Sequence, residues 1–420
     1  MSDRDELLSW ERLARSLAPE ILALIEQAVR IAETQHMPIY LVGGPVRDLF
    51  LQQSITDIDL VVEGDAWTIA EAFQAEAGGK LTRHAAFRTA AVEIMIGAEP
   101  FVIDFVTARR EVYPAPAALP VIMPSHIHDD LRRRDFTINT LALRLTAADV
   151  TLLDPFAGVE DIRAGLVRVL HDESFVDDPT RMLRGVRFAS RFAFAVVPHT
   201  TALVGAALAE NMIGRTSPQR ILHELWLLLA EPRPEGALLL LYEWGAFPQL
   251  ELVWSSAWLR QFPAARAAAS PDLPLHLIGF GLLVWPMSQA QRSAFATRYN
   301  LPTAERKLLH ELPFAVPPAL HQPELSALEL ERLLHAYSPM ALCVLQLVAS
   351  EVAAAQIALY ATTIRQLPAL LSGDDLRERG VPPGPIYREI LHELRQAQLA
   401  GTIMSRAEAL IWLERRLAQA

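Results

Sequence analysis

The stretch from Leu41 to Val62, LVGGPVRDLFLQQSITDIDLVV, decides how the first part of the chain folds. The apolar segment 38–42 predicts a strand that runs into Gly43 and Gly44, where the lack of a Cβ allows a sharp turn close to a ligand. Pro45 suits the first turn of a helix, because its missing N–H has no intrahelical partner there. A strand, a glycine pair and a helix N-terminus together indicate a phosphate-binding turn.

A second strand, Ile58–Val62, follows Asp57 and carries Asp59 near its start. Side chains two residues apart on a strand point to the same face, so both carboxylates are predicted to project together. They repel each other unless a cation lies between them, and hard oxygen ligands favour magnesium. A glycine pair or an acidic pair alone is more often a plain turn or a solvated surface. At this spacing the combination indicates nucleotidyl or phosphoryl transfer.

The spacing of apolar residues predicts the neighbouring elements. Residues 1–36 indicate one or two helices at the edge of the domain. A helix at 66–77 and strands at 89–96 and 101–106 follow, and this alternation predicts a small α/β domain. The segment 108–130 contains four prolines, and we expect a loop that moves or becomes ordered when substrate binds.

Asp104 interrupts the apolar strand FVIDFV. A carboxylate in such a strand is costly to bury unless it is paired or binds a metal. It is either a third carboxylate that faces Asp57 and Asp59, or a strand-end residue held by Arg109 or Arg110. The sequence leaves both alternatives open.

Two further segments concentrate charge beside apolar residues. The first, LRRRDFTINTLAL at 131–143, predicts an apolar helix with a polar rim, and a salt-bridged helix start explains it as well. The second, HDESFVDDPTRMLRGVRFASRFAF at 171–194, predicts a helix with Pro179 in its first turn and Asp178 at or near its N-cap. Alone, it describes an ordinary capped amphipathic helix.

Composition limits the possible classes of protein. The chain of 420 residues has room for two to four domains, and no apolar run is long enough for a membrane helix. The N-terminal segment lacks the pattern of a signal peptide. The single cysteine, Cys343, excludes an internal disulfide and fits a reducing cytosol, so we expect a cytoplasmic protein without a membrane partner.

The net charge of −11 argues against generic nucleic-acid binding, because phosphate contacts need local positive charge. Arginines nevertheless cluster at 132–134 and at 181–191, whereas Lys80 and Lys307 are the only lysines. Arginine suits bidentate contacts with phosphates and base edges, although a genomic base bias could produce the same preference. Net charge therefore does not identify the partner.

Together these segments resemble the polymerase-β-like nucleotidyltransferases. More narrowly, they are similar to the class II tRNA nucleotidyltransferases (CCA-adding enzymes and their CC- or A-adding relatives) and to bacterial poly(A) polymerases. The resemblance implies an α+β protein, with a small polymerase-β-like α/β head domain followed by an all-helical neck, body and tail. The expected division is N-terminal helices at 1–36, a catalytic head at 37–150, a base-recognising neck at 151–265, and a tRNA-binding body and tail at 266–420.

The resemblance also implies the chemistry. The family adds C and A from CTP and ATP to the tRNA 3′ end without a template, depends on Mg²⁺, and releases pyrophosphate. Carried over to this sequence, Asp57 and Asp59 hold the metal ions and Asp104 is the candidate third carboxylate. The resemblance implies that Gly43, Gly44 and Arg47 bind the phosphates of the nucleotide.

The segment 131–143 reproduces the RRDFTxNA element of the family, with Thr140 in place of the usual Ala. In the family this element contacts the ribose and phosphates of the incoming nucleotide. The resemblance assigns these contacts to Arg134 and Asp135, with Asn139 in support.

The segment 171–194 contains the E/D-D-P-x-R element, whose Asp and Arg bind the base edges of CTP and ATP in the family. Asp178 and Arg181 occupy these positions; Asp accepts from an exocyclic amine and Arg donates to ring acceptors. Arg184 and Arg187 complete the expected nucleotide-binding set. Asp177 replaces the Glu common in full CCA-adding members, so base choice stays open.

Two alternatives accompany this reading. A bacterial poly(A) polymerase would share the head and neck motifs, but it is expected to carry a basic C-terminal extension, which the acidic ending here lacks. The other alternative is a tRNA-binding protein with a vestigial catalytic site; the intact acidic pair argues against it. The choice among CCA, CC and A addition and the oligomeric state are not decided by the sequence.

Overall fold

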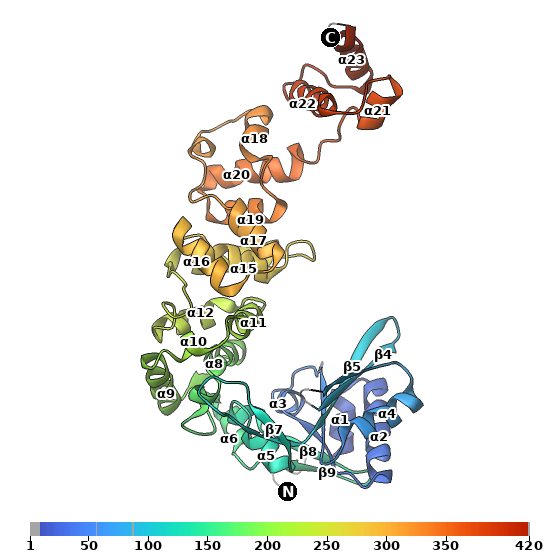
Figure 1. Cartoon of the computed structure of the whole chain (residues 1–420), viewed down its shortest axis with the longest axis vertical. Coiled ribbons are helices and arrows are strands. Elements are labelled where there is room, and N and C mark those ends of the chain that lie inside the picture. Colours follow the sequence, from blue (N-terminus) through green and yellow to red (C-terminus); the bar gives the residue numbers. More distant parts are fainter. Residues whose placement is uncertain (1–8, 56, 86–87, 419–420) are drawn as a thin grey trace. The chain divides into compact units, whose positions relative to one another are not determined.

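The computed structural model describes residues 9–55, 57–85 and 88–418 (Figure 1). These residues form two compact units. Of the described residues, those up to 228 and at 236–250 form the first unit, and those at 229–235 and 251–418 form the second. None of the helices in the described ranges has the length and apolarity needed to cross a membrane.

The first unit is built on a seven-stranded sheet in the order β3-β4-β5-β2-β1-β8-β9. β2 and β5 run parallel, and the other neighbouring pairs of this sheet run antiparallel. The strands are β1 (Ile39–Val42), β2 (Ile58–Val62), β3 (Lys80–His84), β4 (Thr89–Ile96), β5 (Glu99–Thr107), β8 (Ala142–Leu145) and β9 (Val150–Leu153).

The two faces of this sheet are covered unequally. α4 (Ala66–Ala77) packs on one face, where Phe73 contacts Phe105 with ring centroids 5.2 Å apart, and α2 (Pro19–Thr34) packs against α4. On the other face, α5 (Ile127–Arg132) covers β1, β2 and β8 with a buried apolar cluster that reaches β5 at Val106. The β4–β5 hairpin extends beyond these elements (cyan in Figure 1).

Several predicted elements are confirmed. The helix at 66–77 and the strands at 58–62 and 89–96 have the predicted bounds, and the strand at 101–106 is longer at both ends. The N-terminal segment forms two helices, α1 (Trp10–Ser16) and α2, and α3 (Gly44–Phe50) begins beside Pro45. The apolar patterns sufficed for these segments because their apolar residues are buried in the domain core.

The prediction of an irregular loop at 108–130 is wrong. β6 (Arg109–Val112) and β7 (Val121–Pro124) form an antiparallel hairpin, and α5 follows. Three of the four prolines lie in the connection between the strands and the fourth ends β7. Proline removes a ladder donor, so a two-stranded hairpin tolerates it only at such positions.

The prediction of a helix at 131–143 is also wrong. α5 ends at Arg132, a 3₁₀ turn covers Thr137–Asn139, and β8 begins at Ala142. The carboxylate of Asp135 accepts hydrogen bonds from the Phe136 N–H and the Asn139 amide. These local bonds compete with a helix and hold an irregular turn in its place.

The rest of the chain is mostly helical, which confirms the expected fold class. One departure is a short parallel pair, β10 (Leu166–Val167) with β11 (Ala195–Val196). Each of these strands follows a helix whose C-cap residue, Gly165 or Ala193, has a left-handed backbone conformation. The helices of this region are α6 (Gly158–Ala164), α7 (Ser174–Asp177), α8 (Thr180–Phe192), α9 (Pro198–Ala209), α10 (Met212–Arg215), α11 (Pro218–Leu229) and α12 (Pro234–Glu243).

Buried apolar clusters in the described part of the second unit include one around Leu345 and Tyr360 and one around Ile390 and Leu413. The predicted boundaries at 150 and 265 stay a prediction. The elements are α13 (Ser256–Leu259), α14 (Phe262–Ala268), α15 (Leu275–Val284), α16 (Gln289–Tyr299), α17 (Thr303–Glu311), a 3₁₀ turn (Pro318–His321), α18 (Ala327–Leu334), α19 (Pro339–Val348), α20 (Glu351–Leu359), a π-helical turn (Tyr360–Ile364), α21 (Gly373–Glu378), α22 (Pro385–Leu399) and α23 (Arg406–Ala418).

Candidate active site

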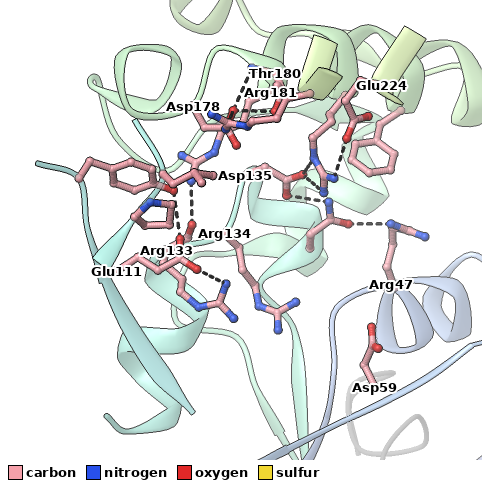
Figure 2. A pocket seen from close by; sticks show the side chains of 18 residues that line it. Arg47, Asp59, Glu111, Arg133, Arg134, Asp135, Asp178, Thr180, Arg181 and Glu224 are labelled. Atoms are coloured by element: carbon pink, nitrogen blue, oxygen red, sulfur yellow. Dashed lines mark hydrogen bonds and ion pairs between the residues drawn. The ribbon is translucent and has the colours of Figure 1, made fainter. Parts of the chain in front are cut away.

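A cavity of about 520 Å³ opens within the first unit, between the sheet and the start of α8 (Figure 2). Six segments distant in sequence meet there: the turn after β1, β2 at Asp59, the β6–β7 hairpin, the turn at 133–139, the start of α8, and α11. The lining residues are Gly44, Arg47, Asp59, Glu111, Tyr113, Leu119, Pro120, Arg133, Arg134, Asp135, Asn139, Asp178, Thr180, Arg181, Arg184, Phe188, Arg220 and Glu224.

The turn after β1 depends on Gly43. Its φ of +69° lies in the left-handed region, which a residue with a Cβ rarely adopts. A Cβ at this position would also lie 2.6 Å from a guanidinium nitrogen of Arg134. The arginine therefore lies directly against the glycine backbone and brings a positive charge to the turn, while its Nη2 is held by Asp130 at 3.0 Å.

Two carboxylates face each other on neighbouring strands. Asp59 on β2 is the register partner of Asp104 on β5, and such strands lie about 4.8 Å apart. Burial raises the pKa of Asp59 to about 6; Arg134 opposes this shift, and Asp104 and Asp57 add to it. Burial likewise raises the pKa of Asp104. Asp104 therefore lies beside Asp59 on the same face of the sheet. Its role as a third carboxylate stays a prediction.

These carboxylates suit a divalent cation in their donor chemistry. Asp57 is exposed and immediately precedes β2, and its charge raises the pKa of both other carboxyl groups. Within the described part of the chain, no three His, Cys, Asp or Glu side chains converge as a cluster that could hold a metal ion. These residues fit a divalent cation because their carboxylate oxygens are close enough to repel one another, and a cation would relieve that repulsion.

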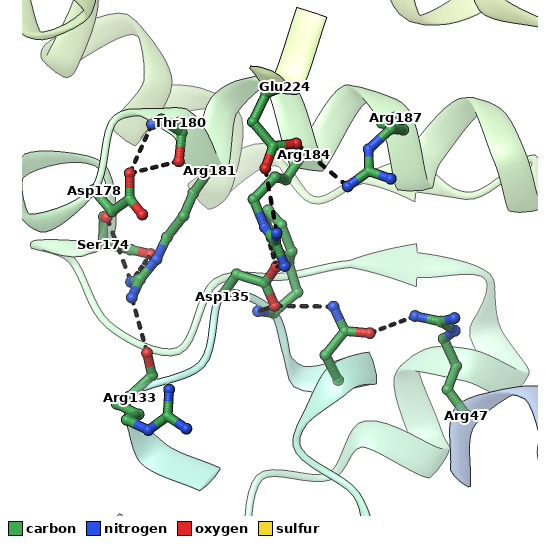
Figure 3. A network of polar contacts seen from close by, with 12 residues as sticks. Arg47, Arg133, Asp135, Ser174, Asp178, Thr180, Arg181, Arg184, Arg187 and Glu224 are labelled. Atoms are coloured by element: carbon green, nitrogen blue, oxygen red, sulfur yellow. Dashed lines mark hydrogen bonds and ion pairs between the residues drawn. The ribbon is translucent and has the colours of Figure 1, made fainter. Parts of the chain in front are cut away.

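Asp135 is the centre of a buried polar network (Figure 3). One carboxylate oxygen accepts from the Phe136 N–H at 2.8 Å and the Asn139 amide at 2.9 Å, and the other pairs with Arg184 at 2.6 Å. Burial alone would raise the pKa of Asp135, but Arg184 and Asn139 lower it to about 2. The carboxylate is therefore ionised and held by its partners.

The network continues on both sides of Asp135. Asn139 accepts from Arg47 at 2.6 Å, and the Arg47 guanidinium lies 4.7 Å from the centre of the Phe192 ring. On the other side, Arg184 contacts Glu224 at 3.4 Å, and Glu224 pairs with Arg187 at 3.3 Å. A continuous series of polar contacts thus joins α3 to α8 and α11.

The two predicted base-recognition residues have partners of their own. Arg181 is buried and donates to Ser174 Oγ at 2.9 Å and to the Arg133 carbonyl at 2.8 Å. Asp178 accepts from the Thr180 N–H at 3.0 Å and pairs with Arg220 at 2.7 Å. Contacts within the protein therefore hold both side chains at the wall of the cavity.

The β6–β7 hairpin forms the remaining wall. Glu111 pairs with Arg133 at 3.0 Å and with Arg109 at 3.3 Å, and it accepts from the Tyr113 hydroxyl at 3.0 Å. The connection between the strands is fixed at Ala117, whose carbonyl accepts from Arg220 at 3.0 Å. The hairpin is thereby tied to the segment that carries Asp178.

Comparison with known proteins decides the family. Residues 39–168 match the family described as "Poly A polymerase head domain". The A-adding tRNA nucleotidyltransferase of Halalkalibacterium halodurans is 35% identical over 403 residues, which cover 94% of this chain and 92% of the relative. The chain belongs to the tRNA nucleotidyltransferase family.

Other members are also similar to this nucleotidyltransferase. The CC-adding tRNA nucleotidyltransferase of Deinococcus radiodurans is 42% identical over 207 residues, 49% of this chain and 54% of the relative. A CCA-adding enzyme solved in an apo form has a TM-score of 0.80 and 29% identity, with 98% of both chains covered. Similar CCA-adding enzymes have been solved with ATP and CTP, and the Thermotoga maritima enzyme has been solved with tRNA.

The cavity of this nucleotidyltransferase contains nine of the thirteen predicted site residues: Gly44, Arg47, Asp59, Arg134, Asp135, Asn139, Asp178, Arg181 and Arg184. The other four, Gly43, Asp57, Asp104 and Arg187, lie outside its described lining. Sequence reasoning missed Glu111 and Tyr113, because their segment was expected to be a loop, and Phe188 and Glu224. Glu224 had a usable signal, since it interrupts the apolar helix ILHELWLLL.

Proposed function

We propose that this nucleotidyltransferase adds A, C or both from ATP and CTP to the 3′ end of tRNA, without a template and with Mg²⁺, and releases pyrophosphate. The observation that carries the proposal is that the cavity brings Asp59, the arginines beside the glycine turn, and Asp178 with Arg181 to one place. The names of the near-full-length relative and of the ligand-bound CCA-adding enzymes support the same substrates. A cytoplasmic location is part of this proposal.

The carboxylates would hold the metal. Asp57 and Asp59 are the proposed ligands, with Asp104 as the third carboxylate beside them. The chemistry that bound Mg²⁺ supplies is Lewis-acid stabilisation of the attacking hydroxyl oxygen and of the triphosphate.

The rest of the reaction is positioning. The oxygen of the tRNA 3′-hydroxyl forms a bond to the α-phosphorus, the bond from that phosphorus to the bridging oxygen breaks, and pyrophosphate leaves with the electron pair while the hydroxyl proton passes to solvent. Arg47 and Arg134 provide positive charge beside the turn where the phosphates would lie. Because Arg134 is braced by Asp130 and Arg47 by Asn139, both charges are in place before the nucleotide binds.

Asp178 and Arg181 would select the base. A carboxylate accepts from the exocyclic amine shared by adenine and cytosine, and a guanidinium donates to their ring acceptors, so the pair disfavours guanine and uracil. Arg220 fixes Asp178, and Ser174 fixes Arg181. All three specificities have a similar relative: the A-adding enzyme aligns over 92% of its length, the CC-adding enzyme over 54%, and a CCA-adding enzyme structure is covered to 98%. The assay below distinguishes them.

The test is a labelled-nucleotide assay with Mg²⁺ on tRNAs that end before CCA, after C and after CC, with CTP and ATP offered separately and together. Extension of only the CC-ended tRNA by one A would establish A addition, and completion of CCA would establish the full activity. Long A tracts would assign the protein to the poly(A) polymerases. No incorporation of any nucleotide would reject the proposal in favour of a vestigial site.

Asp59→Asn and Asp57→Asn provide the matched test of the carboxylates. Both substitutions should abolish transfer and leave the unfolding transition in EDTA at or above that of the wild type, because removing a charge that faces another carboxylate relieves repulsion. Glu99→Gln, on an exposed position of β5, is the control that should keep full activity. Wild-type turnover in either Asp variant would contradict the assignment.

A further inference from the structure

One face of β3, β4 and β5 is uncovered beside the carboxylates. Side chains in register across neighbouring strands share a face, and Thr82, Ala91, Asp104 and Asp59 form one such row across β3, β4, β5 and β2. The next row toward the tip of the hairpin is Lys80, Glu93 and Val102. The face of the sheet that carries Asp59 and Asp104 therefore continues outward over β5, β4 and β3.

Exposure shows that this face is open. Val102 is 40% exposed and Met95 is 59% exposed, and Lys80 and Thr82 are exposed as well. Residues of the opposite face on the same strands, such as Val92 and Phe105, are completely buried on the α4 side. We call the set Lys80, Thr82, Met95 and Val102 the open strand face.

The covered part of the same face ends close to the carboxylates. The apolar cluster under α5 includes Val61 and Val106. Asp104 lies two residues further along β5 and is only half buried. The acidic row is thus the border between a covered region on the β1 side and an open region on the β4 side.

Strand order places the nucleotide on one side of this border. Gly43 and Gly44 follow β1, which lies next to β2 on the side away from β5. The cavity with Arg47 and Arg134 is on that side and includes Asp59 in its lining. In phosphoryl transfer the attacking and leaving oxygens lie roughly in line, so the attacking hydroxyl arrives from the side opposite the pyrophosphate.

We propose that the open strand face seats the single-stranded 3′-terminal nucleotides of the RNA acceptor as they approach Asp59 and Asp104. This inference rests on the proposed function and names the surface that presents the second substrate. Lys80 would contact a backbone phosphate, and Met95 and Val102 would provide an apolar support for a base or ribose. Glu93, opposite Lys80, reduces the positive charge of the surface.

Charge reversal at two neighbouring positions tests the face. Lys80→Glu should raise KM for a CC-ended tRNA about fivefold or more, and leave KM for ATP at saturating tRNA within about twofold. Arg83→Glu is the matched control: it makes the same charge change on the same strand, but Arg83 points to the opposite face, where it pairs with Glu71. Equal effects of the two variants on KM for tRNA would overturn the inference.

Two further variants sharpen this test. Val102→Glu places a negative charge on the apolar part of the face and should raise KM for tRNA in the same way as Lys80→Glu. Glu93→Lys should lower KM for tRNA, because it removes the one acidic side chain of the Lys80 row. Unchanged KM values in both variants would contradict the inference, since these exposed substitutions leave the fold intact.

Photocrosslinking separates this inference from the proposed function. A tRNA with a photoreactive nucleotide at its last position should crosslink to peptides that contain residues 80–84 or 89–107. If the wild-type protein transfers nucleotides but the crosslinks fall entirely elsewhere, the open strand face is not the acceptor site, while the proposed function stands. If the wild-type protein transfers nothing to any tRNA, the proposed function itself fails.

Discussion

At the scale of single residues, Asp135 connects three partners within the protein: the Phe136 N–H, the Asn139 amide and the Arg184 guanidinium. Its two oxygens hold the turn at 136–139 and Arg184, and through them Arg47 and Glu224. A buried ion pair adds little net stability when both partners are present, but removing one partner leaves the other charge unpaired. Asp135 is therefore a structural support of the site as well as a proposed ligand contact.

Asp135→Asn should lower the free energy of unfolding of the first unit by about 3–5 kcal/mol, because Arg184 loses its closest acceptor. The depressed pKa of Asp135, about 2, means that the pair stabilises the fold above pH 4 and that this contribution is lost as pH falls from about 4 to about 2. The difference between variant and wild type in urea unfolding should therefore shrink over that range.

The control for this measurement is Glu71→Gln, which removes one partner of the exposed pair with Arg83. That change should cost less than about 1 kcal/mol and show no comparable dependence on pH. A loss in Asp135→Asn no larger than in Glu71→Gln would show that the network does not support the fold.

Gly43 and Gly97 offer a matched pair of alanine substitutions. Both glycines have φ near +65°, so alanine should cost each about 1 kcal/mol or more. A Cβ at Gly97 meets open space, whereas at Gly43 it displaces Arg134. Gly43→Ala should therefore raise KM for the nucleotide about tenfold and Gly97→Ala should not. Equal nucleotide KM values in steady-state assays would exclude a phosphate role for this turn and arginine.

At the scale of elements, the success of sequence reasoning depended on where each segment finds its partners. The helix at 66–77 and the strand at 58–62 have continuous apolar faces, so their periodicity was sufficient. The turn at 133–139 was expected to be helical because charged residues stand beside apolar ones; local bonds of Asp135 hold the turn instead, and Arg184, 49 residues away, fixes Asp135 there. Such a partner is invisible in the local sequence. Motif resemblance named candidate site residues without showing which of them share one cavity.

The β6–β7 hairpin was not revealed by the sequence, and Glu111 connects it to Arg133 and Tyr113. Glu111→Gln should weaken the contacts to Arg133 and Arg109 and raise KM for ATP about tenfold, because the wall of the cavity is no longer fixed. Isothermal titration with ATP would measure the same loss in Kd. Wild-type affinity would show that the hairpin wall is not needed for nucleotide binding.

At the scale of the whole molecule, the chain divides into two compact units, and each contains a buried apolar cluster of its own. The proposed nucleotide site lies entirely in the first unit, because every described lining residue precedes position 225. Nucleotide binding and the proposed grip on the body of the tRNA are therefore assigned to different parts of the chain, as units with their own cores can fold independently.

A fragment of residues 1–250 should fold and bind ATP with a Kd within about threefold of that of the full chain, since the lining of the cavity is complete in it. It should transfer nucleotides to tRNA poorly, because the proposed tRNA-binding body and tail are missing. Calorimetry should show one transition for the fragment and two for the full chain. Loss of ATP binding in a folded fragment would contradict this division.

Because β2 and β5 pair in register, the acidic site depends on whether the spacing of residues within each strand is odd or even, and not on the length of the connections between strands. Asp59 and Asp104 are 45 positions apart in sequence, yet they meet because both strands place them on the same side of the pleat. One residue added at the Gly97–Ala98 turn would leave that side unchanged. One residue added between Val102 and Asp104 would turn a carboxylate toward α4 and an apolar side chain toward the substrate. Relatives could therefore vary the turn freely while the spacing within the strand stays even.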